Sequence, residues 1–468
     1  MKIPLLQSLI EHNSDKTFLI SAEKRITYGK FLILVSKICN FLNERTERYI
    51  FINAEKNEFT LAAYFACAKL GKIAAFIDPM SKFPEQFLSL TNNSFYFSST
   101  LYDELKDREY IMIDNSDQTE DNEMSEIIFT TGTTGNPKGV LLSHNTVYKT
   151  AKNINKFTNL KSTDVEMHMM PISHSFGLAR IRCCIIAGCP IVLHNGFGNL
   201  NLFFESLKKN KGSVISTVPA GINFLLKLAK QKIEKFSDQI RMIELGSAPM
   251  TKEEKMLLLE VLPNTDICMH YGLTEASRST FLNFSNDINF IDSVGKQNFG
   301  TNLLILNSKK EICKVNELGE ICIKGTNLFS KYIFTESKAS FHNDYFQTGD
   351  YGYLNEQGYL FFQARKDEMM NIAGKKVSPL EIEKYLNKLS YIEESACIQS
   401  KNSNTGLDEI RAYIVLKDSN CPSNISFEIK KELKNHIEYY KIPTSIINIG
   451  KIPKSSNGKI LRNKLKEK

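Results

Sequence analysis

The sequence predicts an α/β protein built from more than one domain. Its 468 residues exceed what one hydrophobic core normally serves, which indicates two or three domains. Near the start of the chain, apolar runs of strand length alternate with stretches of helical spacing, an order typical of parallel α/β organisation. After residue 366 the composition becomes rich in lysine, and the remainder has the size of a small domain. We therefore expect a large N-terminal domain over residues 1–366 and a small α+β domain over residues 367–468.

The opening strand–helix–strand unit is the clearest local pattern. Residues Tyr28 to Leu42 carry apolar side chains at helical spacing, and Tyr49 to Asn53 form a short apolar run. A second helical stretch, Phe59 to Leu70, ends at Gly71, after which Ile73 to Ile77 read as another strand. Two parallel strands joined by a helix are the expected result.

Composition and charge exclude several classes of protein. The hydrophobic fraction of 42% is that of a folded soluble protein, and no apolar run approaches the roughly 18 residues of a membrane span. The N-terminal segment is too short and too interrupted for a secretory signal, and the ten cysteines form no Cys-x-x-Cys pair. These features predict a cytoplasmic protein without a disulfide framework or a zinc site. The net charge of +7 suits anionic ligands such as nucleotides, coenzyme A or an acidic carrier protein, and no basic patch with interleaved aromatic residues favours nucleic acid.

A glycine- and threonine-rich stretch, Glu126 to Gly139, carries the strongest chemical signal. Its glycines allow backbone N–H groups to approach an anion, its hydroxyls add donors, and its lysine adds a positive charge. The stretch differs from a Walker A loop because Pro137 precedes Lys138 and Gly139 follows it. We expect it to hold phosphates through Thr130, Thr131, Gly132, Thr133, Thr134, Gly135 and Lys138.

This stretch closely resembles the phosphate loop of the acyl-adenylate-forming (AMP-binding) superfamily. That superfamily includes acyl-CoA synthetases, the adenylation domains of peptide synthetases and beetle luciferases. Thr131 stands where the family more often has serine, a change that keeps the hydroxyl. The resemblance implies a large domain of layered α/β sheets with a β subdomain, followed by a small mobile domain.

A second signature, Tyr271-Gly272-Leu273-Thr274-Glu275, follows the loop in the family's order. Tyr271 offers a flat face to a nucleobase, Thr274 offers a hydroxyl to a phosphate, and Glu275 offers a hard oxygen ligand to Mg²⁺. The strand Ile240 to Leu245 comes earlier, and the resemblance implies that the loop after it stacks on adenine through its backbone. That loop consists of Gly246, Ser247, Ala248 and Pro249.

The motif around His174 bears on the substrate. The resemblance places His174 against the pocket for the acyl carboxylate, where it would shape the pocket and contact the acid. Amino-acid-activating relatives usually carry an acidic residue here that pairs with the substrate ammonium, whereas His174-Ser175-Phe176 contains none. A plain carboxylic acid, fatty or aromatic, is therefore the favoured substrate. An amino-acid-activating carrier-protein ligase remains an alternative.

Later motifs complete the predicted nucleotide site. Short strands near residues 302–306 and 319–323 predict the β subdomain. The resemblance implies that Asp350 and Arg365 grip the ribose and that Asp367 is the hinge before the small domain.

In the small domain we expect the helix Pro379 to Leu389 capped by Ser378, two strands, and a helix from Phe427 to Tyr439. The resemblance makes Gly374 part of the thiol channel, although Asn371 stands where acyl-CoA synthetases often have lysine. Lys459, in an Asn-Gly turn, is the predicted catalytic residue.

The resemblance implies an ATP-dependent acid–thiol ligase. A carboxylate would attack the α-phosphorus of ATP to give an acyl-adenylate and pyrophosphate, with Lys459 and Mg²⁺ on Glu275 offsetting the negative charge. A thiol, either coenzyme A or the phosphopantetheine of a carrier protein, would then take the acyl group. A homologue that binds nucleotide without catalysis is another possibility. A luciferase-like oxygenase is a further one, but no feature of the sequence supports it.

Overall fold

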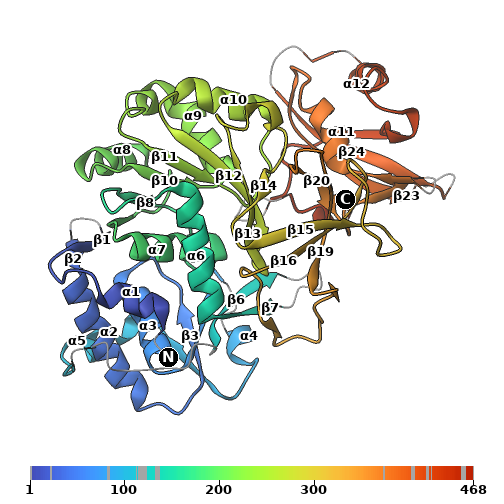
Figure 1. The fold of residues 1–468 in the computed structure, drawn as a ribbon. Helices are drawn as coiled ribbons and strands as arrows, with labels where there is room; N and C mark the ends of the chain where they lie inside the picture. The colour runs from blue at the N-terminus through green and yellow to red at the C-terminus, as the bar shows by residue number, and fades with distance from the viewer. Residues whose placement is uncertain are drawn as a thin grey trace. The chain divides into compact units, whose positions relative to one another are not determined.

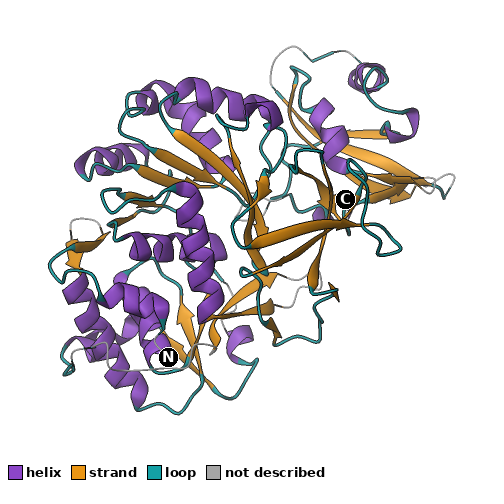
Figure 2. Ribbon diagram, viewed as in Figure 1, coloured by secondary structure: helices purple, strands orange, loops and turns teal. Residues whose placement is uncertain are grey.

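The computed structural model divides the chain into two compact units (Figures 1 and 2). Unit 1 comprises residues 1–247, 252–303 and 323–346, and unit 2 comprises residues 248–251, 304–322 and 347–468. The structure describes residues 3–21, 24–81, 85–111, 113, 124–131, 137–372, 375–401, 406–417, 421–422, 424–454 and 460–466. The domain boundary between residues 366 and 367 stays a prediction.

One sheet of unit 1 has six strands and contains the predicted strand–helix–strand pattern. Its strand order is β17-β7-β6-β4-β3-β5. The four consecutive strands β6, β4, β3 and β5 are parallel to one another. The strands are β3 (Tyr49–Asn53), β4 (Ile73–Ile77), β5 (Ser94–Phe97), β6 (Met124–Thr131), β7 (Pro137–Ser143) and β17 (Lys331–Ile333). Helices α2 (Tyr28–Asn43) and α3 (Glu58–Lys69) pack together, and Gly71 ends the second with a φ of 64°.

The second sheet of unit 1 has nine strands in the order β14-β13-β12-β11-β10-β8-β9-β1-β2. They are β1 (Thr17–Ser21), β2 (Lys24–Thr27), β8 (Glu166–His168), β9 (Ile191–Leu193), β10 (Val214–Thr217), β11 (Met242–Leu245), β12 (Asp266–Leu273), β13 (Ala276–Asn283) and β14 (Lys296–Gln297). Helices α6 (His144–Thr158) and α7 (Ser175–Ala187) pack against each other. Both helices lie next to strands of this sheet, α7 against β8 and α6 against β13 (Figure 1).

Strand β10 (Val214–Thr217) is shorter than the apolar stretch of sequence that contains it, which continues to Ala220. It ends at Thr217, and Pro219 opens α9 (Pro219–Glu234) as the first helical residue. Proline suits that position because its missing N–H has no partner in the first turn of a helix. The sequence pattern therefore switches from strand to helix at the proline.

The predicted β subdomain is present as a five-stranded sheet. Its order is β15-β16-β19-β18, with β20 paired to β19. The strands are β15 (Thr301–Leu306), β16 (Gly319–Gly325), β18 (Phe341–His342), β19 (Tyr345–Leu354) and β20 (Leu360–Arg365).

The C-terminal part of unit 2 is a small α+β assembly. It contains the hairpin β21 (Met370–Ile372) and β22 (Lys375–Val377), the sheet β23-β24-β25, and helices α11 and α12. The remaining bounds are α11 (Pro379–Leu386), β23 (Ile392–Lys401), β24 (Asp408–Leu416), α12 (Ile425–Leu433) and β25 (Ser445–Asn448). Ser378 caps α11 as expected, accepting a hydrogen bond from the Glu381 backbone N–H at 3.4 Å.

The helix predicted from Phe427 to Tyr439 ends earlier than expected, so this prediction was wrong. Helix α12 stops at Leu433, and the chain turns before a short 3₁₀ segment, η3 (Tyr439–Lys441). The apolar spacing continues to Ile437, whose side chain reaches the same core as Ile429 and Leu433 from the turn. Periodicity alone cannot distinguish a buried turn residue from another helical one.

Most of the cysteines lie in the core. All except Cys313 and Cys421 are buried, and burial raises the pKa of the Cys39 and Cys183 thiols to about 12. Cys421 alone is exposed among the ten, all of which the structure describes. Within the parts of the chain that the structure covers, no helix has both the length and the apolar character needed to cross a membrane.

Candidate active site

The phosphate-loop lysine is held at the base of a hairpin. Strands β6 and β7 pair antiparallel, with Thr130 opposite Lys138, and the Thr130 hydroxyl donates to the Lys138 carbonyl at 3.5 Å. Gly139 is required there because a Cβ would lie 2.8 Å from a methyl group of Ile333. Thr131 ends β6, whereas the loop residues Gly132, Thr133, Thr134 and Gly135 lie outside the described residues.

The second signature meets this lysine. The Lys138 ammonium lies 3.3 Å from Oε1 of Glu275, although 137 positions separate the two residues (275 − 138). The hydroxyl of Tyr332, on β17, donates to the same oxygen at 2.9 Å, and the ammonium stands 3.8 Å from the centre of the Tyr332 ring. We call Lys138, Tyr332 and Glu275 the lysine–tyrosine–glutamate triad.

The backbone around Glu275 is tightly constrained. Tyr271 lies near the end of β12, which forms an antiparallel hairpin with β13, and Thr274 and Glu275 form the turn between the strands. A Cβ at Gly272 would lie 2.5 Å from the backbone nitrogen of Arg278, so only glycine fits this approach. The hairpin thereby places the carboxylate of Glu275 beside β7 and β17.

The site's donor set fits a magnesium ion bound together with a nucleotide. Across the described residues, no group of three or more His, Cys, Asp and Glu side chains could hold a metal by itself. Mg²⁺ typically takes one or two protein carboxylates and completes its shell with substrate phosphates and water. Glu275 supplies one such carboxylate, close to the lysine that would face the phosphates.

Behind the hairpin lies a group of charged residues that the sequence analysis missed. Glu244 on β11 accepts hydrogen bonds from Arg180 at 3.0 Å and from Nε of Arg278 at 3.1 Å. Arg180 also donates to Glu166 at 2.7 Å, and Nδ1 of His270 lies 2.8 Å from Glu244. We call Glu166, Arg180, Glu244, His270 and Arg278 the buried charge cluster.

The cluster's two acids and two arginines balance each other. Arg180, Glu166 and Glu244 have no exposed surface, and Arg278 is 2% exposed. Burial acts to raise the pKa of the Glu244 carboxyl, but Arg278 and Arg180 hold it well below its usual range. Burial lowers the pKa of His270, and Arg278 adds to that effect, whereas the contact with Glu244 acts in the opposite direction.

The cluster supports the two loops predicted to line the adenylate. A Cβ at Gly246 would lie 2.2 Å from the His270 ring, so the ring packs directly on the backbone of the predicted adenine loop. The next residue, Ser247, has a φ of 73°, while Ala248 is half-buried and Pro249 is exposed. His270 therefore has a structural role that its sequence position did not reveal.

Arg278 connects the cluster to the predicted acid-binding loop. Its guanidinium donates to the backbone carbonyls of Ser175 at 3.3 Å and Phe176 at 3.1 Å, and its Cζ lies 4.6 Å from the centre of the Phe176 ring. His174 precedes this helix as its N-terminal cap residue, and its Nε2 lies 3.8 Å from a carboxylate oxygen of Asp78.

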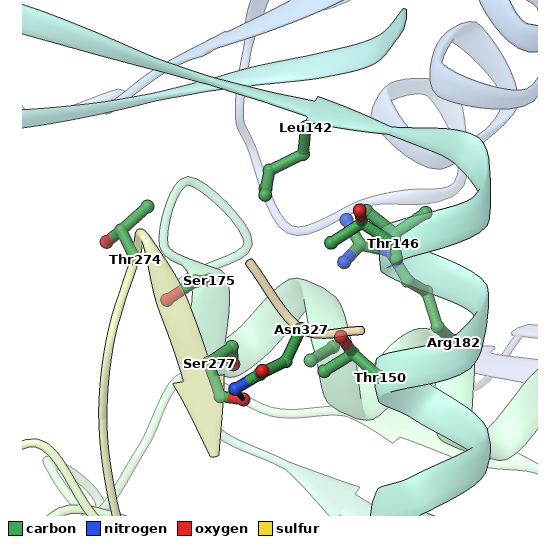
Figure 3. Close-up of a pocket in the computed structure, with 10 residues that line it drawn as sticks. Leu142, Thr146, Thr150, Ser175, Arg182, Thr274, Ser277 and Asn327 are labelled. Atoms are coloured by element: carbon green, nitrogen blue, oxygen red, sulfur yellow. Dashed lines mark hydrogen bonds between the residues drawn. The ribbon is translucent and has the colours of Figure 1, made fainter. Parts of the chain in front are cut away.

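A small cavity lies between the start of α7, α6 and the β12–β13 turn. Figure 3 shows Thr274 and Ser175 on one side and Thr146, Thr150 and Arg182 on the other. Its volume of ≈ 20 Å³ admits one water molecule and neither a nucleotide nor an acid.

The predicted ribose residues come together within unit 2. Nε of Arg365 lies 3.6 Å from Oδ1 of Asp350 and 3.8 Å from Oδ1 of Asp367. Asp350 is 5% exposed. The residue before it, Gly349, donates a backbone hydrogen bond to Oε1 of Glu320 at 3.1 Å, which holds this segment in place. Glu320 belongs to a stretch to which the sequence analysis gave no chemistry.

The tail that carries the predicted catalytic lysine is anchored beside it. Arg462 forms a two-point bond to Glu383 on α11, at 2.6 and 3.0 Å, and both residues are buried. Lys454 and Ile460, which flank the predicted Asn-Gly turn in the sequence, form an isolated antiparallel bridge. Lys459 itself and Gly374 fall outside the described residues.

Comparison with known families decides the identity of the fold. The family described as "AMP-binding enzyme" matches residues 83–333, more than half of the chain, and "AMP-binding enzyme C-terminal domain" matches residues 381–459. The chain belongs to the AMP-binding enzyme family. The predicted membership of the acyl-adenylate-forming superfamily is therefore confirmed.

Curated relatives and solved structures agree with this assignment. A 2-succinylbenzoate–CoA ligase of Listeria monocytogenes is 27% identical over 485 residues, covering 99% of this chain and 98% of the relative. The ATP-bound structure of MatB from Rhodopseudomonas palustris has a TM-score of 0.90 at 20% identity, covering 100% of this chain and 99% of that one. The o-succinylbenzoate CoA synthetase of Bacillus subtilis, in complex with its acyl-adenylate, has a TM-score of 0.87 at 24% identity, covering 99% and 97%.

These findings confirm the predicted fold class, a layered α/β N-terminal part with a smaller C-terminal part. They also confirm the predicted class of enzyme, an acid–thiol ligase that works through an acyl-adenylate, because the curated relatives that match over nearly the full length of both proteins are 2-succinylbenzoate–CoA ligases. The roles assigned to individual site residues stay predictions.

Proposed function

We propose that this AMP-binding enzyme joins an aromatic carboxylic acid, of the 2-succinylbenzoate type, to coenzyme A. Two relatives that match 99% of this chain and 98% of their own length carry that activity in their names. The sequence His174-Ser175-Phe176 supports a non-amino acid because it offers no carboxylate to a substrate ammonium.

The observation that carries the proposal is the meeting of Lys138 and Glu275 at 3.3 Å. A phosphate-binding cation and a metal-binding carboxylate must lie together if one triphosphate is to contact both. Lys138 would bind the β- and γ-phosphates with the hydroxyls of the threonine loop. Glu275 would hold Mg²⁺, which offsets the negative charge of the phosphates when bound.

The remaining residues would orient the reactants. Tyr271 and the loop Gly246 to Pro249 would contact adenine, Asp350 and Arg365 the ribose, and Thr274 a phosphate. His174 would contact the acyl carboxylate. No general base is needed because the carboxylate is already ionised at neutral pH.

The small domain would deliver Lys459 to the acyl carboxylate and the α-phosphate. We propose residues 367–468 as that domain, with Asp367 as its hinge and Gly374 beside the thiol. The buried bond between Arg462 and Glu383 supports this role, because it fixes a point three residues beyond Lys459 to helix α11.

The test is acid-dependent exchange of pyrophosphate into ATP, run over 2-succinylbenzoate and panels of other aromatic, fatty and amino acids. We expect exchange with 2-succinylbenzoate or a close aromatic analogue, and its loss in Lys459→Ala with ATP binding retained. Acyl transfer is then compared between coenzyme A and an acyl carrier protein, the alternative acceptor. Exchange that requires an amino acid, or no exchange with any acid, would contradict the proposal.

A further inference from the structure

We propose that Tyr332 is a positioning residue for the nucleotide and the metal, with its hydroxyl acting on Glu275 and its ring acting on Lys138. The inference rests on the proposed function, in which Lys138 faces phosphate and Glu275 faces Mg²⁺. It concerns a tyrosine on β17 that no motif in the sequence analysis singled out.

The backbone of Tyr332 is fixed to the strand that carries Lys138. Strand β17 pairs antiparallel with β7, and Tyr332 stands opposite Val140. Val140 and Lys138 are two positions apart and so project from the same face of β7. The Tyr332 ring is therefore a diagonal neighbour of Lys138, which explains the 3.8 Å between the ammonium and the ring centre.

The same segment is fixed to Glu275. The backbone N–H of Phe329 donates to the Glu275 carbonyl at 2.9 Å, and Leu328 forms an isolated antiparallel bridge with Ala276. The Phe329 and Tyr332 rings lie 4.7 Å apart. Lys138 and Glu275, from distant parts of the chain, are thus both registered against one short stretch that ends in Tyr332.

This arrangement couples the two ligands. Without them, Lys138 and Glu275 neutralise each other across 3.3 Å. A phosphate alone would draw away Lys138 and leave Glu275 without its cation, whereas a phosphate together with a divalent cation satisfies both residues. Binding of nucleotide and of metal should therefore be cooperative. Tyr332 would keep both side chains in place once they separate, because each retains its own contact with the phenol.

The two ends of the phenol can be tested separately in the full-length protein. Tyr332→Phe removes the hydroxyl and keeps the ring, and Tyr332→Leu removes both. The affinity of metal-free ATP is measured by calorimetry in EDTA. The affinity of Mn²⁺ is measured by electron paramagnetic resonance in the presence of α,β-methylene-ATP, which cannot react at the α-phosphate.

For Tyr332→Phe we expect Mn²⁺ affinity to fall about tenfold, the worth of one hydrogen bond to a charged group, with metal-free ATP affinity unchanged. For Tyr332→Leu we expect the same loss for Mn²⁺ and a further loss of about fivefold in metal-free ATP affinity, because the cation–π contact is gone. Unchanged ATP binding by Tyr332→Phe also shows that this variant is folded.

Tyr148→Phe is the matched control, since the Tyr148 ring lies 5.6 Å from the Lys152 ammonium in the same unit and has no role in the proposed site. It should change neither affinity. Wild-type Mn²⁺ affinity in Tyr332→Phe, or equal losses of both affinities in Tyr332→Phe, would overturn the inference. If the wild-type enzyme binds both ligands but exchanges no pyrophosphate with any acid, the proposed function is wrong. The binding measurements on the Tyr332 variants would still test the role of Tyr332.

Discussion

Unit 1 contains two groups of opposite charges that differ in burial. In the buried charge cluster, Arg180, Glu166 and Glu244 are fully enclosed. In the lysine–tyrosine–glutamate triad, the side chain of Lys138 is 22% exposed and that of Glu275 is 10% exposed. The chemistry of the contacts is the same, an ammonium or guanidinium against a carboxylate.

The difference shows how burial separates a supporting role from a binding role. Charges without access to water must keep their partners, because an unpaired buried ion is strongly destabilising. Charges at the surface of a site can exchange partners when a ligand arrives, at little cost in stability. This contrast supports a structural role for the cluster and the ligand-binding role that we propose for the triad.

The largest expected effect comes from breaking the cluster. Glu244→Gln keeps the shape of the side chain but leaves Arg180 and Arg278 with one carboxylate between them. We expect the free energy of unfolding to fall by about 3–5 kcal/mol, measured by urea denaturation. Glu205→Gln, on the exposed face of α8 (Leu200–Lys209), should change it by less than about 0.5 kcal/mol. A loss for Glu244→Gln as small as that of the control would remove the distinction.

A somewhat smaller effect is expected in unit 2, where the buried ion pair of Arg462 and Glu383 is flanked by the less buried Glu368. Glu383→Gln leaves Arg462 with Glu368, at 3.9 Å from its Nε, as its remaining carboxylate, and we expect a loss of about 2–4 kcal/mol in the unfolding free energy of that unit. Arg462→Lys keeps the charge but cannot form the two-point bond, so it should lie between the wild type and Glu383→Gln. Unfolding followed by urea and limited proteolysis of the tail gives the order, and an Arg462→Lys variant less stable than Glu383→Gln would contradict it.

Protonation of a buried histidine tests the same contrast between buried and exposed charges, because it adds a charge to the interior instead of removing one. Burial lowers the pKa of His144 to about 4, with a further contribution from Arg182, whereas an unfolded histidine titrates near 6.5. Between these values the unfolded chain holds the proton and the folded chain does not, so stability falls as pH falls. We expect His144 to account for about 2 kcal/mol of loss between pH 6.5 and 5.

Urea unfolding across that pH range checks this expectation. His144→Gln should show a shallower decline than the wild type. Parallel curves for the wild type and His144→Gln would show that His144 is protonated in the folded protein.

The smallest effect on stability is expected in the triad. Glu275→Gln should change the free energy of unfolding by about 1 kcal/mol at most, because Lys138 keeps its contact with the Tyr332 ring and has access to water. The same variant should require at least about tenfold more Mg²⁺ for half-maximal pyrophosphate exchange. Thermal denaturation and a magnesium titration check the two parts, and a loss of stability as large as that of Glu244→Gln would place the triad with the cluster.

Local patterns in the sequence were sufficient for much of the fold. Strands β3 and β4 have the predicted bounds because short apolar runs end at turn residues, and Ser378 caps helix α11 as predicted. The end of α12 was missed because a buried turn residue, Ile437, continues the helical spacing. Short-range signals thus locate elements better than they locate the ends of elements.

The buried charge cluster was not predicted because its members lie far apart in the sequence. A usable signal was nevertheless present: Glu166 and Glu244 stand within apolar strands, and Arg180 stands within an apolar helix. A charge in such a run must find a partner in the core. Which partner it finds, and the contact of Tyr332 with Lys138 and Glu275, depend on strand order, which the sequence pattern does not specify.

The distribution of the thiols has a practical consequence for testing the domain motion that we propose. Because Cys421 alone is exposed while the other nine are buried or partly buried, a maleimide fluorophore should label the native enzyme at one position in unit 2. No cysteine would have to be removed beforehand. Such a dye would report optically on the proposed small domain during turnover, from the first half-reaction to release of the thioester.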